Sequence, residues 1–184
     1  MVKKLSGWLL NLIFVLIGML VLGLDQYTKY YVNVQPSGIF PIEIIPKFIY
    51  ILKISNSGAA FGFFQNKTNI LIVISIVAII LIIVLKIKLD LKSVLYNISL
   101  GFILGGAMGN LVDRIVWGEV TDFLHVVYFA VFNVADSFIV IGFAIIIIII
   151  LRTFFRKEQL IKINLPENSE IDLPENSEID REKQ

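Results

Sequence analysis

Long runs of apolar residues alternate with polar segments along this chain, and four of the runs are long enough to cross a lipid bilayer. A spanning helix needs about 20 apolar residues. We therefore expect transmembrane helices over residues 7–24, 69–85, 94–112 and 132–155. The predicted fold class is an all-α membrane protein, a bundle of four transmembrane helices.

Two segments between the spans have a different pattern. Residues 35–64 contain three prolines and several alternating or β-branched stretches, which predict a small β-rich platform outside the membrane. Residues 116–128 are short and amphipathic, so we expect an interfacial helix or lid there.

Lysine and arginine residues are concentrated near particular ends of the spans, which predicts the orientation of the bundle. These basic residues are Lys3, Lys4, Lys86, Lys88, Lys92, Arg152, Arg156 and Lys157. If four spans alternate in direction, all of them lie on one side, which is then the cytoplasm. Both termini are therefore expected in the cytoplasm, and residues 25–68 and 113–131 outside it.

The end of the chain changes character. The octapeptide LPENSEID at residues 165–172 is repeated without change at residues 173–180. This acidic, polar sequence has too few apolar groups to form a core. We expect one membrane domain over residues 1–157 and a disordered polar tail over residues 158–184.

Composition narrows the chemistry that the chain can perform. The protein is 57% hydrophobic, with a mean hydropathy of +0.84. The net charge of +1 does not favour nucleic acid as a partner. The absence of cysteine excludes disulfides and thiol chemistry, and a single histidine excludes histidine-rich zinc motifs. An enzyme of this composition has to work mainly with carboxylates, hydroxyls, lysines and amides.

Asp136 is the most informative residue, because no other charge follows it until the far end of its apolar run. A carboxylate at membrane depth costs about 2.5–3.5 kcal/mol on insertion scales, so such residues are usually functional. Asn133 lies three residues before it, on the same helix face. A second acid, Asp122, precedes this span, and we expect Asp136 to be the more buried of the two. Two carboxylates at one membrane surface indicate acid–base chemistry on a membrane-borne substrate.

Helical spacing links other residues of the spans. Asp25 and Lys29 are four apart, which predicts an ion pair that reaches the interface at the helix end, or alternatively a contact near the site. Gly101, Gly105 and Gly109 share one helix face, which predicts close approach of a neighbouring helix.

Three polar residues follow this glycine face at the outer end of the third span. Asn110 and Arg114 lie on one face, and we expect Asn110 to be buried. Asp113 is predicted to pair with Arg114 or with another nearby base.

Other chemistries stay open at this point. His125 lies three residues after Asp122, where a Ser–His–Asp triad is conceivable, and Ser55 and Ser57 lie near Lys53, as a Ser–Lys dyad would require. A four-span transporter or proton-conducting protein could use Asp136 as its relay. The inner halves of the spans hold few polar groups, which disfavours such a path.

Five sequence blocks in one order resemble the lipoprotein signal peptidases, the type II signal peptidases of bacteria. The resemblance covers about residues 24–142. The blocks are DQYTK at 25–29, NSGAAFG at 56–62, GGAMGNLVDR at 105–114, GEVTDF at 118–123 and FNVADS at 132–137.

This resemblance implies a membrane-embedded aspartic endopeptidase with Asp122 and Asp136 as its catalytic dyad. Its substrate would be a prolipoprotein carrying a diacylglyceryl group, cleaved just before the lipidated cysteine. Further residues are expected to bind substrate or support the dyad: Asn56, Asn110, Arg114 and Asn133. Structural residues are expected near the site: Asp25, Lys29, Gly58 and Asp113. We expect no metal or cofactor, membrane lipids as the other partners, and a monomer in the bacterial cytoplasmic membrane with its site near the outer face.

Overall fold

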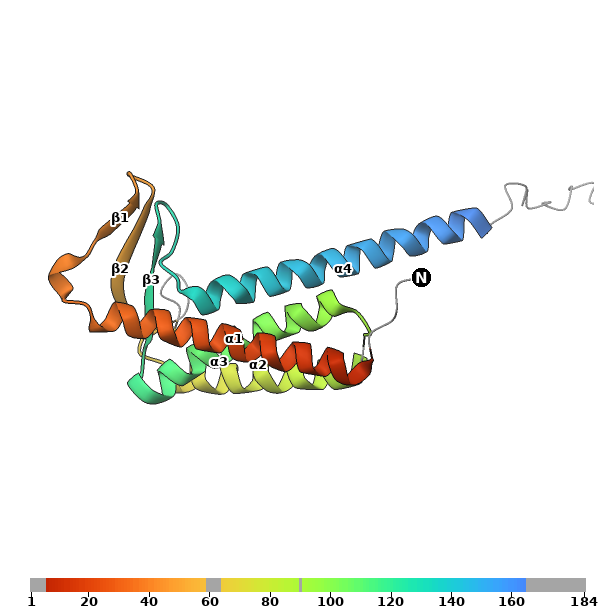
Figure 1. Cartoon of the computed structure of the whole chain (residues 1–184), viewed down its shortest axis with the longest axis horizontal. Helices are drawn as coiled ribbons and strands as arrows, with labels where there is room; N and C mark the ends of the chain where they lie inside the picture. The colour runs from red at the N-terminus through yellow and green to blue at the C-terminus, as the bar shows by residue number, and fades with distance from the viewer. Residues whose placement is uncertain (1–5, 59–63, 90, 165–184) are drawn as a thin grey trace, which may run out of the picture. The chain divides into compact units, whose positions relative to one another are not determined.

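Four long helices carry most of the chain, and a small antiparallel sheet accompanies them (Figure 1). The computed structural model describes residues 6–58, 64–89 and 91–164, with side chains as far as residue 158. The helices are α1 (Gly7–Val34), α2 (Thr68–Leu89), α3 (Val94–Trp117) and α4 (Val134–Asn164). All four are long and apolar enough to cross a membrane, which confirms the predicted four-span fold.

The chain divides into two compact units, Met1–Ile148 and Ile149–Gln184. The first unit contains α1, α2, α3, the sheet and the first turns of α4. In the second unit, α4 continues to Asn164, so the prediction of disorder is wrong for residues 158–164. Their glutamate, glutamine, leucine and lysine residues are good helix formers. The tandem repeat lies outside the described residues.

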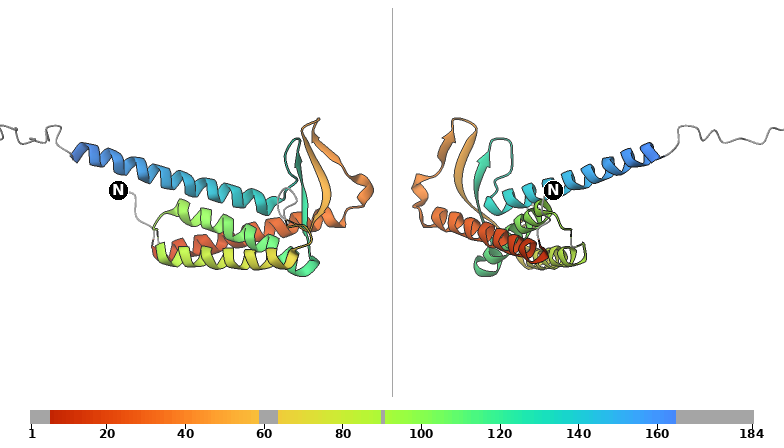
Figure 2. Two further views of the ribbon diagram at one scale, coloured as in Figure 1. Left: turned by 180° about the vertical axis from the view of Figure 1, so that it is seen from behind. Right: turned by 45° about the vertical axis from the view of Figure 1, so that its right-hand side comes forward.

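Helix α3 packs against both α1 and α2 (Figure 2). A Cβ atom at Gly105 would lie 2.5 Å from the carbonyl oxygen of Gly18, and one at Gly101 would lie 2.8 Å from Ile17 Cγ2. The glycine face of α3 therefore meets α1 at backbone distance, as the spacing predicts. Lipid supplies no hydrophobic drive for helix association, so this close packing and interhelical hydrogen bonds hold the two helices together.

The first turns of α4 lie against α3 in the same way. A Cβ atom at Gly106 would lie 2.5 Å from the carbonyl oxygen of Ala135 and 2.7 Å from Ile139 Cγ1. Further along, a Cβ at Gly142 would lie 2.8 Å from the carbonyl oxygen of Ser99. These contacts place the start of α4 beside Gly106 and a later turn of α4 beside Ser99.

The sheet has the strand order β1 (Ile42–Ile45), β2 (Ile49–Asn56) and β3 (Val120–Val126), with both pairs antiparallel. A short 3-10 helix, η1 (Ser37–Ile39), precedes β1. Strands β1 and β2 confirm the β-rich character predicted for residues 35–64. Asp122 on β3 lies opposite Ile54 on β2. Strand β3, which follows α3 in the sequence, therefore adds Asp122 to the sheet.

The prediction of a separate helix over residues 116–128 is wrong, whereas the alternative of a lid stays a prediction. Helix α3 continues to Trp117 and ends at Gly118, whose φ of +78° is the left-handed conformation that glycine adopts without strain. The chain then pairs with β2 as β3, because Val120, Thr121 and Val126 favour extended backbone and β2 offers free backbone groups.

After β3 the chain folds back on itself. Phe132 pairs with Leu124 through backbone bonds of 2.8 and 3.0 Å, so α4 begins only at Val134. This return brings the start of α4 next to Asp122.

Candidate active site

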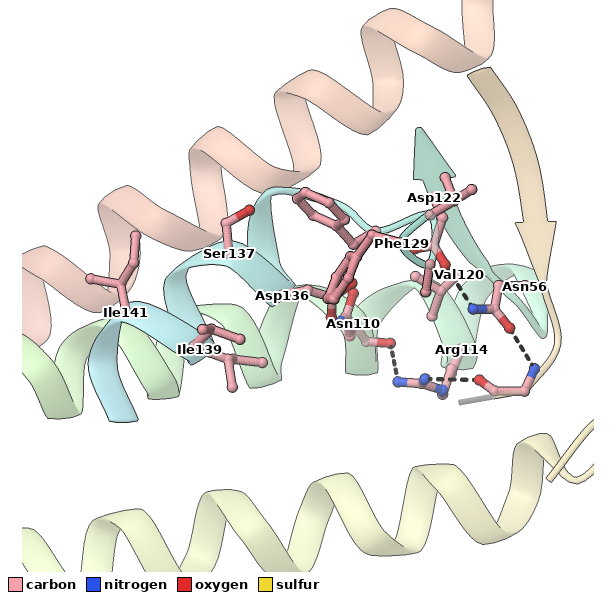
Figure 3. Close-up of a pocket in the computed structure, with 15 residues that line it drawn as sticks. Asn56, Asn110, Arg114, Val120, Asp122, Phe129, Asp136, Ser137, Ile139 and Ile141 are labelled. Atoms are coloured by element: carbon pink, nitrogen blue, oxygen red, sulfur yellow. Dashed lines mark hydrogen bonds between the residues drawn. The ribbon is translucent and has the colours of Figure 1, made fainter. Parts of the chain in front are cut away.

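One pocket of about 540 Å³ holds most of the site residues predicted from the sequence. Its polar end is lined by Asn56, Gly58, Asn110, Arg114, Asp122 and Asp136. Gly58 follows β2, and the other five come from β2, α3, β3 and α4. These five gather at one end of the pocket, while Ile139 and Ile141 continue along α4 (Figure 3). The pocket is therefore polar at the sheet and apolar along the helix.

The start of α4 is fixed by a reciprocal pair of hydrogen bonds. The Asp136 amide donates to Asn133 Oδ1 at 3.0 Å, and the Asn133 amide donates to Asp136 Oδ2 at 3.2 Å. This is a capping box, in which the N-cap residue and the third helical residue satisfy each other's backbone. Asp136 thus has a structural role as well as a position in the pocket.

Asp122 is held by two side-chain amides. Asn56 Nδ2 donates to its Oδ2 at 2.7 Å, and Asn133 Nδ2 donates to its Oδ1 at 2.7 Å. Because Asn133 bonds both acids, it links the strand β3 to the helix α4. Asn133 is completely buried.

Asp122 is more buried than Asp136, which is the opposite of the prediction. Asp122 is only 3% exposed, whereas Asp136 is half-buried. Asp136 opens onto the pocket at the helix start, while Asp122 is covered by its amide partners and the neighbouring elements. Burial is the main reason that the pKa of Asp122 is raised from 3.8 to about 6; the hydrogen bond from Asn56 opposes this rise and the charge of Asp136 adds to it.

Asn110 and Arg114 form the α3 side of the pocket. Asn110 Nδ2 donates to Asp136 Oδ1 at 2.8 Å, and Asn110 itself is buried as predicted. Arg114 donates from Nη1 to the Asn110 carbonyl at 3.3 Å and from Nη2 to the Gly58 carbonyl at 3.4 Å. Asn56 Oδ1 accepts from the Gly58 amide at 2.9 Å, which fixes the end of β2.

Behind the pocket lies a buried ionic cluster. Lys29 Nζ is 2.8 Å from Asp25 Oδ2 and 3.0 Å from Asp113 Oδ2. The predicted Asp25–Lys29 pair is confirmed, but it does not reach the interface, since α1 continues to Val34 and neither side chain is more than 3% exposed. Asp113 pairs with Lys29 and not with Arg114.

Gln26 is a member of this cluster that sequence reasoning missed. Its Nε2 donates to Asp113 Oδ1 at 2.8 Å and to the Gly109 carbonyl at 3.1 Å. The available signal was a polar residue next to Asp25 within a spanning helix. The apolar pocket wall was also missed: Phe129, Ala130, Val131, Phe132, Ile139, Val140 and Ile141.

The described contacts do not assemble the alternative nucleophiles. Both Asp122 oxygens are bonded by asparagines, and the His125 ring lies 6.2 Å from that of Tyr50. Ser55 donates to Glu119, whereas Lys53 donates to the Asn33 carbonyl at 2.7 Å. Neither a Ser–His–Asp triad nor a Ser–Lys dyad is formed by these residues.

Known proteins match this chain over most of its length. The profile of the family described as signal peptidase (SPase) II matches residues 17–152. A lipoprotein signal peptidase of Caldanaerobacter subterraneus subsp. tengcongensis is 48% identical over 125 residues, covering 66% of this chain and 84% of that protein. A second one, from Bartonella tribocorum, is 40% identical over 157 residues, covering 81% and 93% respectively.

Two solved structures are similar to this chain in fold. A bacterial membrane enzyme determined by the in meso method at 2.3 Å resolution superposes with a TM-score of 0.73 and 32% identity, over 78% of this chain and 90% of that one. A second such structure, at 1.9 Å resolution, has a TM-score of 0.68 and 34% identity, over 75% and 92%. Because the profile covers most of the chain and the relatives exceed 30% identity, this multi-pass membrane protein belongs to the signal peptidase II family.

Proposed function

We propose that this membrane protease is an aspartic endopeptidase that removes signal peptides from diacylglyceryl-modified prolipoproteins, cutting just before the lipidated cysteine. One observation carries the catalytic assignment. Asp122 and Asp136 line one pocket, and Asn133 bonds both of them. Its side-chain amide donates to Asp122, and its backbone amide donates to Asp136. Two acids held in this way are suited to sharing a proton.

The two acids take different roles in this scheme. Asp122, with its raised pKa, carries the proton and donates a hydrogen bond to the scissile carbonyl oxygen. Asp136 lies at the positive end of the α4 dipole, where a carboxylate is stabilised, and acts as the base. It takes a proton from water as the water oxygen attacks the carbonyl carbon. The C–N bond then breaks as the amine leaving group receives a proton from the dyad.

The shape of the pocket supports a lipid-modified substrate. Its apolar wall runs from Phe129 to Phe132 and along α4 from Ile139 to Ile141, next to the polar end. Acyl chains on the substrate cysteine would lie along this wall while the peptide reaches the acids. Arg114 and the Gly58 carbonyl lie where they can bind peptide backbone.

We also propose that the site is at the outer membrane face and both termini are in the cytoplasm. Thr68, at the start of α2, donates to the Gly118 carbonyl at 2.7 Å, which ties that end of α2 to the end of α3 next to the sheet. Lys86 and Lys88 lie in the last turn of α2, at the end away from the pocket. Basic residues mark the cytoplasmic side.

The dyad is tested with Asp122→Asn and Asp136→Asn, which replace each acid with an amide of the same shape. Each purified variant is incubated with a diacylated lipobox peptide, and the products are identified by mass spectrometry. We expect no cleavage by either aspartate variant and an unchanged cleavage rate for the exposed control Glu43→Gln. All three variants should show an unfolding transition, as folded proteins do. Substantial cleavage by either aspartate variant would rule out the dyad.

Two further measurements separate this mechanism from its alternatives. Cleavage should be indifferent to EDTA, and loss that zinc restores would contradict a metal-free reaction. The same peptide without its acyl chains should be cleaved poorly, because it cannot use the apolar wall.

A proton-conducting role is not favoured by the polar contacts of the bundle. Asn97 and Ser99 are buried in the inner half of α3, which the sequence reading did not anticipate. Asn97 donates to the carbonyls of Leu91 and Ser93, and Ser99 donates to that of Tyr96. These bonds close the α2–α3 connection and the first turn of α3, and they do not extend toward Asp136.

A further inference from the structure

The ammonium group of Lys29 has its full set of hydrogen-bond partners. It lies 2.8 Å from Asp25 Oδ2, 3.0 Å from Asp113 Oδ2 and 2.9 Å from Asn110 Oδ1. An ammonium group has three N–H donors, so all three are used. The side chain is only 3% exposed, which leaves no place for water to substitute for a lost partner.

Both carboxylates that bind Lys29 also hold the backbone next to a dyad residue. Asp25 Oδ1 accepts from the amide of Ala135, the residue before Asp136, at 2.9 Å. Asp113 Oδ2 accepts from the amide of Thr121, the residue before Asp122, at 3.3 Å. One lysine therefore connects the backbone supports of both acids, one on α4 and one on β3.

Lys29 is one of two donors that fix which way the Asn110 amide faces. Asn110 Oδ1 accepts from Lys29 and, at 3.1 Å, from Asn133 Nδ2. Its Nδ2 is then left to donate to Asp136 Oδ1. A rotated amide would place its NH₂ group against two donors and its oxygen against a carboxylate, so hydrogen-bond chemistry permits only one orientation.

We propose that Lys29 is a positioning residue for peptide hydrolysis, which orients Asn110 toward Asp136 and ties the supports of Asp136 and Asp122 to one buried cation. The inference rests on the proposed function, because it assumes that these two aspartates form the dyad. Lys29 itself does not line the pocket and is not assigned a contact with substrate.

The charge of Lys29 gives this role a signature that packing alone would lack. Charged groups act on Asp122 from three helices: Lys29 on α1, Arg114 on α3 and Asp136 on α4. The neutral contacts come from Asn56 and Asn133. The Lys29 charge lowers the pKa of Asp122 against the effect of burial. Without that charge the pKa of Asp122 rises, and Asp122 keeps its proton to higher pH.

The test compares Lys29→Gln with Lys86→Gln. Lys86 is a matched control, since it is also a buried lysine with an asparagine partner: its Nζ donates to Asn11 Oδ1 at 2.7 Å, away from the pocket. The pH dependence of kcat is measured for both variants on the diacylated peptide, with thermal unfolding to quantify the folded fraction.

For Lys29→Gln we expect kcat per folded molecule to fall about 100-fold, the loss typical of a misplacement of about 1 Å near a reacting group. The alkaline limb of its pH profile, which reports loss of the Asp122 proton, should also move to higher pH. For Lys86→Gln neither quantity should change. An unmoved limb or an unchanged kcat in Lys29→Gln, or an equal shift in Lys86→Gln, would overturn the inference.

One additional variant keeps the outcome decisive. Lys29→Gln leaves two buried acids without their cation, so Lys29→Gln is also combined with Asp113→Asn, which restores the wild-type net charge of the cluster. This double variant should still lose kcat, because Asn110 Oδ1 keeps only the Asn133 donor and the supports of the two acids lose their shared cation. If Asp122→Asn or Asp136→Asn is active, the proposed function fails. If both are inactive and the Lys29 variants behave like wild type, only the positioning role fails.

Discussion

Replacing Gly106 with alanine tests whether the position of α4 controls the reaction. The added Cβ would lie 2.5 Å from the carbonyl oxygen of Ala135, where ordinary contacts begin at 3.4 Å. Relief requires the start of α4 to move by about 0.9 Å, the difference between those two distances. Asp136 follows Ala135 directly, so a shift along its bond to Asn110 would stretch that bond from 2.8 Å to about 3.7 Å. A bond of that length is no longer a hydrogen bond.

We expect Gly106→Ala to lower kcat about 100-fold, because misplacement of about 1 Å near the reacting groups has an effect of that order. The measurement is cleavage of the diacylated peptide by the purified variant, corrected for the folded fraction by thermal unfolding.

Two other glycines separate this effect from general packing. A Cβ at Gly23 meets nothing within 4 Å, so Gly23→Ala should be neutral or stabilising by at most about 1 kcal/mol, the helix-propensity difference. Gly101→Ala meets Ile17 and the Phe14 carbonyl at 2.8–2.9 Å, and it should lower the unfolding temperature without reducing kcat per folded molecule. A Gly106→Ala enzyme with the wild-type kcat would refute the claim that the α3–α4 contact sets the dyad geometry.

Two further predictions concern the acids and the residue between them. Asn133→Ala should lose the cap of α4, which costs about 1 kcal/mol of stability. Asn133→Ser keeps a capping oxygen. Both variants should lose activity, because neither supplies the NH₂ group that bonds Asp122. Thermal unfolding and peptide cleavage of the two variants check this, and an active Asn133→Ser would contradict it. The second prediction is a pH dependence of stability. The folded-state pKa of Asp122, about 6, lies above its ordinary value of 3.8, so the stability gained by binding this proton is fully present below about pH 4 and is lost as the pH rises through about 6. At 1.36 kcal/mol per pH unit the loss of stability is at most about 3 kcal/mol. Asp122→Asn has no proton to lose at this position and should not show this loss. Parallel stability curves for the wild type and Asp122→Asn between pH 4 and 8 would contradict the raised pKa.

Local patterns were sufficient to predict the helices and one of their interfaces. Apolar length identified all four spans, and the spacing of Gly101, Gly105 and Gly109 predicted the face of α3 that meets α1. The Asp25–Lys29 pair followed from a four-residue spacing within one helix. In each of these cases the information lies within a single segment of the chain.

Features that depend on distant segments were not predictable in the same way. The strand β3 forms because β2 lies beside it, and α2 and α3 separate the two in sequence. The burial of Lys29 depends on Asp113 from another helix, which no spacing within α1 can indicate. The order of burial of Asp122 and Asp136 was predicted wrongly for the same reason, since depth along a span says nothing about which neighbours cover a residue on an adjoining strand.

The packing of the bundle and the chemistry of the site depend on the same contacts. Gly109 has no side chain because the carboxylate of Asp25 occupies that space, and Asp25 in turn binds Lys29 and the start of α4. In a membrane, where burial of apolar surface does not favour one helix neighbour over another, such polar contacts and small residues specify the arrangement. Substitutions of Asp25 should therefore reduce stability and activity together. Residues that contact the acids without joining the helices, such as Asn56, should affect activity with little effect on stability.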